Sequence, residues 1–271
     1  MFLSPVIRQA LTSMREDKTH RLGAALAYYS LFSLVPLLLF LLFIFGGLLS
    51  QPGVQLGVLN SVGQYFGAPV KELLGSVLSN VQSVRIEGVY GLILLGVLLF
   101  SATGAFRHLK ESMNIIWHIS EVPRFSILTT IYKNSLALFM IFFTGLLMLV
   151  SMSFTVAFSS VLEQGLLSFR VFEAINFLFT LSITSVVFAL MFSSLPDKTL
   201  SFKEMFLPGF ITALLFVLVK IPFGIYLGLS NITTTFGAAG SMVVFLLWIY
   251  VSAQIFLFGA ELSRAHYLSK K

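Results

Sequence analysis

Residues 24–49 read AALAYYSLFSLVPLLLFLLFIFGGLL and contain no charged side chain. An apolar run of about 18 or more residues is long enough to cross the hydrocarbon core of a bilayer as an α-helix. The run is too long for the apolar core of a signal peptide, and no small-residue cleavage site follows it. We therefore expect this segment to be retained as a transmembrane helix.

Five further runs of the same kind follow along the chain. The six predicted spans cover about residues 24–49, 89–106, 135–160, 174–195, 205–229 and 238–260. The composition agrees, since 57% of the residues are hydrophobic and 10% are charged, against about 45–50% and about 25% in soluble domains. The sequence predicts an all-α integral membrane protein, a six-transmembrane-helix bundle that forms a single membrane domain over residues 1–271.

The positions of lysine and arginine predict the orientation. Thirteen of the 17 lie in the N-terminal segment, the 2–3 and 4–5 connections and the C-terminal tail, and three lie on the opposite side. Connections rich in lysine and arginine stay in the cytoplasm. Both termini are therefore expected to be cytoplasmic, in a multi-pass membrane protein.

Two connections have the pattern of amphipathic helices. Between Pro5 and Arg21, apolar residues share one helical face, which predicts an interfacial helix on the inner leaflet, with a plain basic tail as the alternative. In the outer 1–2 connection, apolar residues recur at helical spacing from Pro69. That second helix, over about residues 69–86, is expected to pack on the bundle or to lie in the outer interface.

Lys220 lies near the middle of the fifth predicted span. A charge at the bilayer centre costs about 2.5–3.5 kcal/mol on insertion scales, so such a residue normally has a partner or a wet cavity. One interpretation is a cation that faces a central cavity and binds an anionic headgroup. A second is a structural lysine at a kink, because Pro222 leaves the carbonyl of Leu218 without its helical donor. A third is snorkelling of the side chain to an interface.

Polar side chains gather in the cytoplasmic half of the predicted spans. Together with Pro36 and Lys220 they predict a substrate pathway open to the inner leaflet or the cytosol. Helix packing is the competing account, because hydroxyl groups in membrane helices often bond only to their own backbone. These residues are Tyr28, Tyr29, Ser30, Ser33, Ser101, Thr103 and Gln254, with Asn114 and Trp117 just beyond the spans.

Glu261 completes the candidate set at the cytoplasmic end of the sixth span. Its depth differs from that of Lys220 by about 15–20 Å along the helix axis, which is too far for a direct pair. We expect Glu261 to meet Arg264, or a basic residue of the first or third cytoplasmic segment, in a structural role.

No pattern in the sequence indicates catalysis. The chain has no cysteine, and its four histidines are not at metal-binding spacing. It has no P-loop, no GxSxG motif and no carboxylate pair at motif spacing. We predict no catalytic residue, no metal and no cofactor, and no nucleic-acid partner, since topology explains the basic loops.

Three segments carry a resemblance to a known family. They are AALAYYSLFSLVP at 24–36, NIIW at 114–117 and GAAGSMVVFLLWIYVSAQIFLFGAELSR at 237–264. The sequence resembles, nearly end to end, the YihY/BrkB family of bacterial inner-membrane proteins. The resemblance implies six spans and an inner-membrane location. Members have carried a ribonuclease label that is regarded as mistaken, and others are linked to serum resistance or to export of envelope lipid and lipopolysaccharide.

Three functional hypotheses follow. The first is a transporter or translocase of an amphipathic anionic substrate, such as a lipid or an envelope glycolipid, with Lys220 engaging its phosphate or carboxylate. The second is a non-transporting envelope scaffold or partner subunit. The third, a membrane-bound ribonuclease, is the least favoured, because it needs metal carboxylates or paired histidines on a solvated face. Membrane lipids are the expected partners, and the sequence leaves the oligomeric state open.

Overall fold

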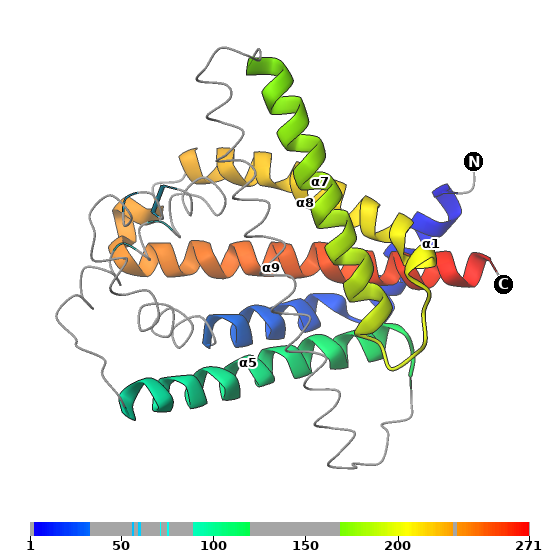
Figure 1. Ribbon diagram of the computed structural model, residues 1–271, viewed down its shortest axis with the longest axis horizontal. Helices are drawn as coiled ribbons and strands as arrows, with labels where there is room; N and C mark the ends of the chain where they lie inside the picture. Colours follow the sequence, from blue (N-terminus) through cyan, green and yellow to red (C-terminus); the bar gives the residue numbers. More distant parts are fainter. Residues whose placement is uncertain are drawn as a thin grey trace. The chain divides into compact units, whose positions relative to one another are not determined.

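The computed structural model describes residues 3–32, 56, 59–60, 71, 75, 89–119, 169–229 and 232–270. Within these ranges the chain forms helices, turns and loops, and no strand. The bounded helices are α1 (Leu3–Glu16), α5 (Val89–Ile116), α7 (Phe169–Ser194), α8 (Phe202–Leu229) and α9 (Ile232–Ser269), labelled in Figure 1. Residues 19–32 are also helical.

Three of the described helices contain a segment long and apolar enough to cross a membrane. These segments are Phe177–Ser194 in α7, Phe202–Val219 in α8 and Val243–Ser269 in α9. Between 28% and 33% of each segment is buried within the chain, and most of the remaining residues are half-buried, with a few exposed ones such as Leu178 and Val243. Apolar surface of this kind is typically covered by lipid or by another part of a protein.

The predicted spans can be compared with these helices. The fourth, fifth and sixth lie on α7, α8 and α9, and the second lies on α5. The first span is described only as far as residue 32. The third span, 135–160, and the outer helix, 69–86 apart from positions 71 and 75, lie outside the described residues. The six-span topology and its orientation stay predictions.

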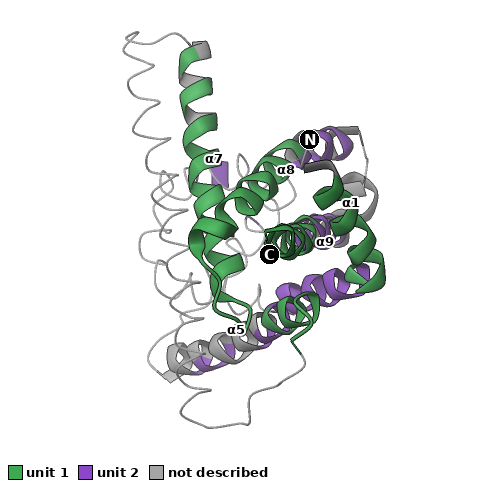
Figure 2. Cartoon of the chain, turned by 90° about the vertical axis from the view of Figure 1, so that its right-hand side faces the viewer, with its two compact units in different colours: residues 1–19, 110–218, 255–271 green, residues 20–109, 219–254 purple. Residues whose placement is uncertain are grey.

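The chain forms two compact units, coloured in Figure 2. Unit 1 comprises Met1–Thr19, Lys110–Leu218 and Ile255–Lys271. Unit 2 comprises His20–Leu109 and Val219–Gln254. The boundaries fall inside α5, α8 and α9, so each of these helices contributes residues to both units.

An aromatic cluster joins α7, α8 and α9 in unit 1. Phe256 of α9 lies 5.4 Å from Phe192 and 6.3 Å from Phe188, both of α7, between ring centroids. Phe216 of α8 meets Phe188 edge-on at 5.9 Å. Aromatic pairs at these separations add attraction beyond the area that they bury.

Two glycines allow these helix backbones to come close. A Cβ atom on Gly209 of α8 would lie 2.7 Å from the backbone nitrogen of Ala189 and 3.0 Å from the carbonyl oxygen of Ser185, both in α7. A Cβ atom on Gly259 of α9 would lie 2.6 Å from Cζ of Phe192 and closer still to Thr212. Any side chain larger than hydrogen therefore collides at both positions.

Helix α1 uses its apolar face for packing within unit 1. Val6 and Ala10 are buried against Leu262 and Ala265 of α9. Leu11, which the sequence places on the same apolar face, is 52% exposed. Helix α9 therefore covers part of the face that predicted an interfacial helix, and Leu11 of that face stays exposed.

Candidate functional site

The candidate residues of the sequence analysis are divided between the two units. Asn114, Trp117 and Glu261 belong to unit 1. Tyr28, Ser33, Pro36, Ser101, Thr103, Lys220 and Gln254 belong to unit 2. Ser33 and Pro36 lie outside the described residues, as do the side chains of Ser101, Thr103 and Lys220, whose backbones are helical.

In unit 2, aromatic rings pack against Tyr28 and Tyr29 of the predicted band. Tyr28 is 55% exposed and packs against Tyr29 and Phe32, with ring centroids 5.6 and 4.7 Å away. Tyr29 in turn stacks on His108 of α5 at 4.0 Å. This contact ties helical residues 19–32 to α5 and is compatible with ordinary helix packing.

In unit 1, polar side chains converge on the turn after α1. Asp17 follows α1 and donates its backbone amide to the carbonyl of Ser13 at 2.8 Å. Lys18 then takes a positive φ of 52°, and the hydroxyl of Thr19 donates to the carbonyl of Met14 at 3.2 Å. The turn fixes the Asp17 carboxylate at the junction of two helical segments, with its side chain 13% exposed.

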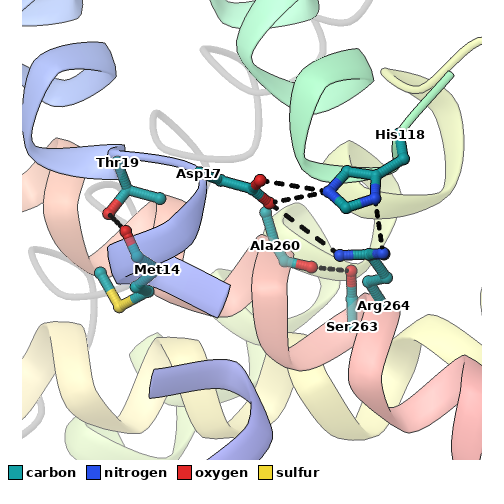
Figure 3. Close-up of polar contacts among 7 residues, drawn as sticks. All are labelled: Met14, Asp17, Thr19, His118, Ala260, Ser263 and Arg264. Carbon is teal, nitrogen blue, oxygen red and sulfur yellow. Dashed lines mark hydrogen bonds and ion pairs between the residues drawn. The ribbon is translucent and has the colours of Figure 1, made fainter. Parts of the chain in front are cut away.

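Asp17, His118 and Arg264 form a connected group, the Asp17 cluster (Figure 3). Nε2 of His118 lies 3.1 and 3.2 Å from the two carboxylate oxygens of Asp17. Nη2 of Arg264 lies 2.9 Å from Nδ1 of His118, and its Nη1 lies 3.9 Å from Oδ2 of Asp17. Because a guanidinium only donates, Nδ1 must accept, and the imidazole carries its proton on Nε2 and donates it to Asp17.

The Asp17 cluster links three distant parts of the chain. Asp17 and His118 are separated by 101 residues, and His118 and Arg264 by 146. His118 follows α5 in a turn where its own φ is 50°, so the backbone there is fixed in the left-handed region. The group therefore ties the end of α1 and the segment after α5 to α9.

Glu261 lies one turn before Arg264 on α9 and is 1% exposed. Neither of its carboxylate oxygens accepts a hydrogen bond from the part of the chain that the structure describes. The sequence predicted that Glu261 meets Arg264 or a basic residue of the first or third cytoplasmic segment. Arg264 is one of the charged groups that act on the Glu261 carboxyl group, while the close contacts of its guanidinium are with His118 and Asp17. A buried polar group without a hydrogen bond is costly.

A second group, the Asp197 anchor, holds the loop between α7 and α8. The side-chain amide of Asn114 donates to Oδ2 of Asp197 at 2.9 Å, and its carbonyl oxygen accepts from the Asp197 backbone amide at 2.9 Å. Nζ of Lys110 lies 2.9 Å from Oδ1 of the same carboxylate. Asn114 and Lys110 both come from the end of α5, so this helix end holds the loop at three points.

The next residue of the loop, Lys198, makes a cation–π contact. Its Nζ lies 5.2 Å from the ring centroid of Trp117 and 4.6 Å from that of Tyr267. The two rings meet edge-on at 5.5 Å. Cations over aromatic faces at such distances are attracted by the ring quadrupole. Trp117 therefore joins the loop, α9 and the segment after α5.

The sequence singles out Asn114, Trp117 and Glu261, but it does not single out the residues that join the segments around them. These include Asp17, His118 and Asp197. Only the position of these residues in the sequence could have indicated them. Each lies next to the end of a helix, where polar side chains often cap a helix or join segments. Their pairing across more than 80 residues has no sequence signal in a single chain.

Replacement of Asn114 by alanine should destabilise the protein by about 2–3 kcal/mol, because two hydrogen bonds to a mostly buried aspartate are lost. The free energy of unfolding of the purified protein in detergent measures this. Thr12→Ala is the matched control, because the Thr12 hydroxyl is exposed and bonds only to the Arg8 carbonyl of its own helix. Equal effects of the two variants would contradict the role of Asn114.

These contacts show what the candidate site can do chemically. Donors and acceptors in the Asp17 cluster and the Asp197 anchor are directed at one another, which is the arrangement of a joint between segments. Among the described residues no group of three histidine, aspartate or glutamate side chains is placed to hold a metal ion. The described site is therefore a set of contacts that position helices, with one buried carboxyl group, Glu261, outside them.

Comparison with known proteins identifies the family of this chain. The family model described as virulence factor BrkB matches residues 10–270. A UPF0761 membrane protein of Rhodospirillum centenum is 26% identical over 264 residues, covering 95% of this chain and 56% of that protein. A UPF0761 membrane protein of Pseudoalteromonas translucida is 27% identical over 243 residues, covering 88% and 78%. YfkH of Bacillus subtilis, described as ribonuclease-like, is 26% identical over 253 residues, covering 92% and 90%.

The chain thus spans little more than half the length of the Rhodospirillum relative and most of the other two. No solved structure matches it. The family match covers nearly every residue, including the three segments on which the resemblance rests, and the relatives are named as membrane proteins. The chain is a membrane protein that belongs to the BrkB family.

Proposed function

We propose that this protein is an inner-membrane transporter or translocase of an amphipathic anionic substrate, a lipid or an envelope glycolipid. The observation that carries the proposal is the course of α8. This helix runs without interruption from Phe202 to Leu229 through both Lys220 and Pro222. Lys220 therefore lies about 27 Å from one helix end and about 14 Å from the other, at 1.5 Å per residue.

A cation at that depth is costly unless water or an anion compensates for it. In this proposal the Lys220 ammonium faces a water-accessible cavity and binds the phosphate or carboxylate of the substrate. The polar residues of the first and second spans form the entry path from the inner leaflet. The basic connections keep both termini in the cytoplasm, as the charge bias supports.

The experiment uses purified protein in vesicles of phosphatidylethanolamine and phosphatidylglycerol. A fluorescent phosphatidylglycerol is the anionic probe and a fluorescent phosphatidylcholine is the zwitterionic control. An impermeant quencher reports how much probe exchanges between leaflets, with and without an imposed proton gradient. We expect the anionic probe to exchange faster than in protein-free vesicles. Exchange of both probes at the protein-free rate under both conditions would contradict the proposal.

The second candidate is a non-transporting envelope scaffold. It is favoured by the close packing of α7, α8 and α9 around Gly209 and Gly259, which is typical of a static bundle. A closed, dry environment around Lys220 would support it.

The third candidate, a ribonuclease, corresponds to the name of the Bacillus subtilis relative. Purified protein incubated with RNA and Mg²⁺ or Mn²⁺ tests it, and degradation above that of a mock purification would support it.

A further inference from the structure

Helix α1 presents two faces of different chemistry. Val6 and Ala10 on one face are buried against α9, near the C-terminal end of that helix (Figure 1). Side chains three and four residues apart are neighbours on a helix surface, and four exposed residues at that spacing form the opposite face. This set, the α1 outer face, consists of Arg8, Leu11, Thr12 and Arg15. The contacts with α9 therefore explain only the first face of the helix.

The α1 outer face carries a net positive charge. In the part of the chain that the structure describes, no carboxylate forms an ion pair with Arg8 or Arg15. The Asp17 carboxylate is directed into the Asp17 cluster. Glu16 and Lys18, both exposed at the end of the helix, carry opposite charges that offset one another. The two guanidinium groups therefore give this face two positive charges that no described residue compensates.

The apolar residue of this face lies between its two charges. Leu11 is 52% exposed and stands about one helical turn from each of Arg8 and Arg15. Guanidinium groups bind phosphate oxygens through two parallel hydrogen bonds, and an apolar side chain between them enters the boundary of the acyl chains. A face of this composition matches a surface that offers phosphates above an apolar layer, which is the surface of an anionic lipid leaflet.

The position of α1 along α9 agrees with such a contact. Its buried face packs on Leu262 and Ala265, which follow residue 260, the predicted end of the sixth span. At 1.5 Å per residue they lie roughly 3–8 Å beyond that end, and the headgroup layer is about 5–8 Å thick on each side of a bilayer. With the predicted span boundary, α9 therefore holds α1 at the level of the lipid phosphates.

We propose that the α1 outer face binds the phosphate groups of anionic lipids in the cytoplasmic leaflet. Arg8 and Arg15 engage the headgroups, and Leu11 enters the acyl-chain boundary between them. The sequence predicts that the apolar face of this helix contacts the leaflet, whereas α9 covers part of that face. The lipid contact therefore belongs to the opposite side of the helix. This binding is independent of what the protein transports.

Fluorescence quenching by labelled lipids tests the proposal on the whole chain. Leu11→Cys introduces the sole thiol, because the chain contains no cysteine, and a fluorophore is coupled to it. The protein is reconstituted in phosphatidylcholine vesicles that contain a small fraction of a quencher lipid, either phosphatidylglycerol or phosphatidylcholine. Both quencher lipids carry the same nitroxide near the top of an acyl chain, so they differ only in the headgroup and its charge.

The anionic quencher lipid should be the more effective of the two. Each arginine near the surface attracts anionic lipid roughly fivefold, so phosphatidylglycerol should quench at least about fivefold more per mole than phosphatidylcholine. This preference should disappear in Arg8→Gln/Arg15→Gln, and high salt should weaken it. Lys203→Gln/Lys270→Gln is the matched control, because it removes two exposed positive charges elsewhere in unit 1. The control variant should keep the preference.

A second thiol position reports whether α1 stays on α9. Val6→Cys, at a position that is 8% exposed, should react slowly with a maleimide in every background, because α9 covers it. Slow reaction in the arginine variant shows that a loss of quenching reflects lost lipid binding and not release of the helix.

Four results would overturn the proposal. Equal quenching by the two lipids in the unmodified background would mean lipid contact without a preference for anions. No quenching by either lipid would mean that water or another protein surface covers the face. An equal loss of preference in the lysine control variant would assign the effect to overall charge. Reaction of Val6→Cys as fast as that of Leu11→Cys would mean that α9 does not hold α1.

Discussion

Lys220→Met should reduce exchange of the fluorescent phosphatidylglycerol to the rate of protein-free vesicles, while the protein still folds and inserts. Methionine matches the length and apolar character of the lysine stem and removes only the charge. Insertion should improve, because the cost of about 2.5–3.5 kcal/mol for a central charge disappears. Binding of the anionic headgroup, which the proposal assigns to the ammonium, is lost.

Lys220→Arg is the matched control for this prediction. It keeps a positive charge at the same depth, so a substantial part of the exchange should remain, although the planar guanidinium presents its donors differently. Normal exchange by Lys220→Met would rule out the proposed role of Lys220.

A second control separates the substrate-binding role from the kink-capping interpretation. If Lys220 donates to the Leu218 carbonyl that Pro222 leaves without a donor, Lys220→Met should impair folding, and adding Pro222→Ala should restore it. The translocase proposal predicts the reverse: folded Lys220→Met protein, with exchange that Pro222→Ala does not restore. Yield and elution profile of the detergent-purified variants, together with the exchange assay, distinguish the two.

Gly209→Ala should cost about 1–3 kcal/mol of folding free energy, the range for overpacking of a filled core. The atoms that a new Cβ meets belong to the α7 backbone at Ala189 and Ser185, so no side-chain rotation relieves the collision. Gly259→Ala should be destabilising as well, because Phe192 and Thr212 are themselves packed in the core. Reversible unfolding of the purified protein in mixed detergent measures both.

Gly96→Ala is the matched control for the glycine series. Gly96 lies in α5, and a methyl group added there would have nothing within 4 Å of it. Alanine is favoured over glycine in a helix by up to about 1 kcal/mol, so this variant should be neutral or slightly stabilising. Equal losses for the three variants would show that detergent handling or another general effect of the substitutions, and not close approach of the helices, sets the result.

The positions of the long apolar helices in the described residues could be predicted well from the sequence. Lipid requires long, nearly uncharged helices, so apolar runs alone placed the fourth span at 174–195, where α7 covers Phe169–Ser194. The ends of the helices could be predicted less well from the sequence. Helix α9 continues to Ser269, beyond the predicted end at residue 260, because Glu261 and Arg264 end the apolar run without breaking the helix.

The contacts of the candidate site could not be predicted in the same way. The sequence indicates Asn114 and Trp117 as candidates, because they are polar and aromatic residues just beyond a predicted span. Their partners Asp197 and Lys198, however, lie more than 80 residues away in the chain. Such pairs depend on how the helices pack against one another, and these contacts produce no repeating pattern in a single sequence. The burial of Val6 against α9 was missed for the same reason, since an amphipathic face looks alike whether lipid or protein covers it.

The accessibility of position 220 tests the central claim most directly. Lys220→Cys introduces the sole thiol of the chain, and a membrane-impermeant maleimide is applied to intact cells and to inverted vesicles. Cysteines in the predicted connections serve as controls for each side. Labelling of position 220 from one side is the predicted result, and it identifies the side to which the cavity opens. No labelling from either side, with the control cysteines reacting normally, would mean a dry, packed site and would contradict the translocase account.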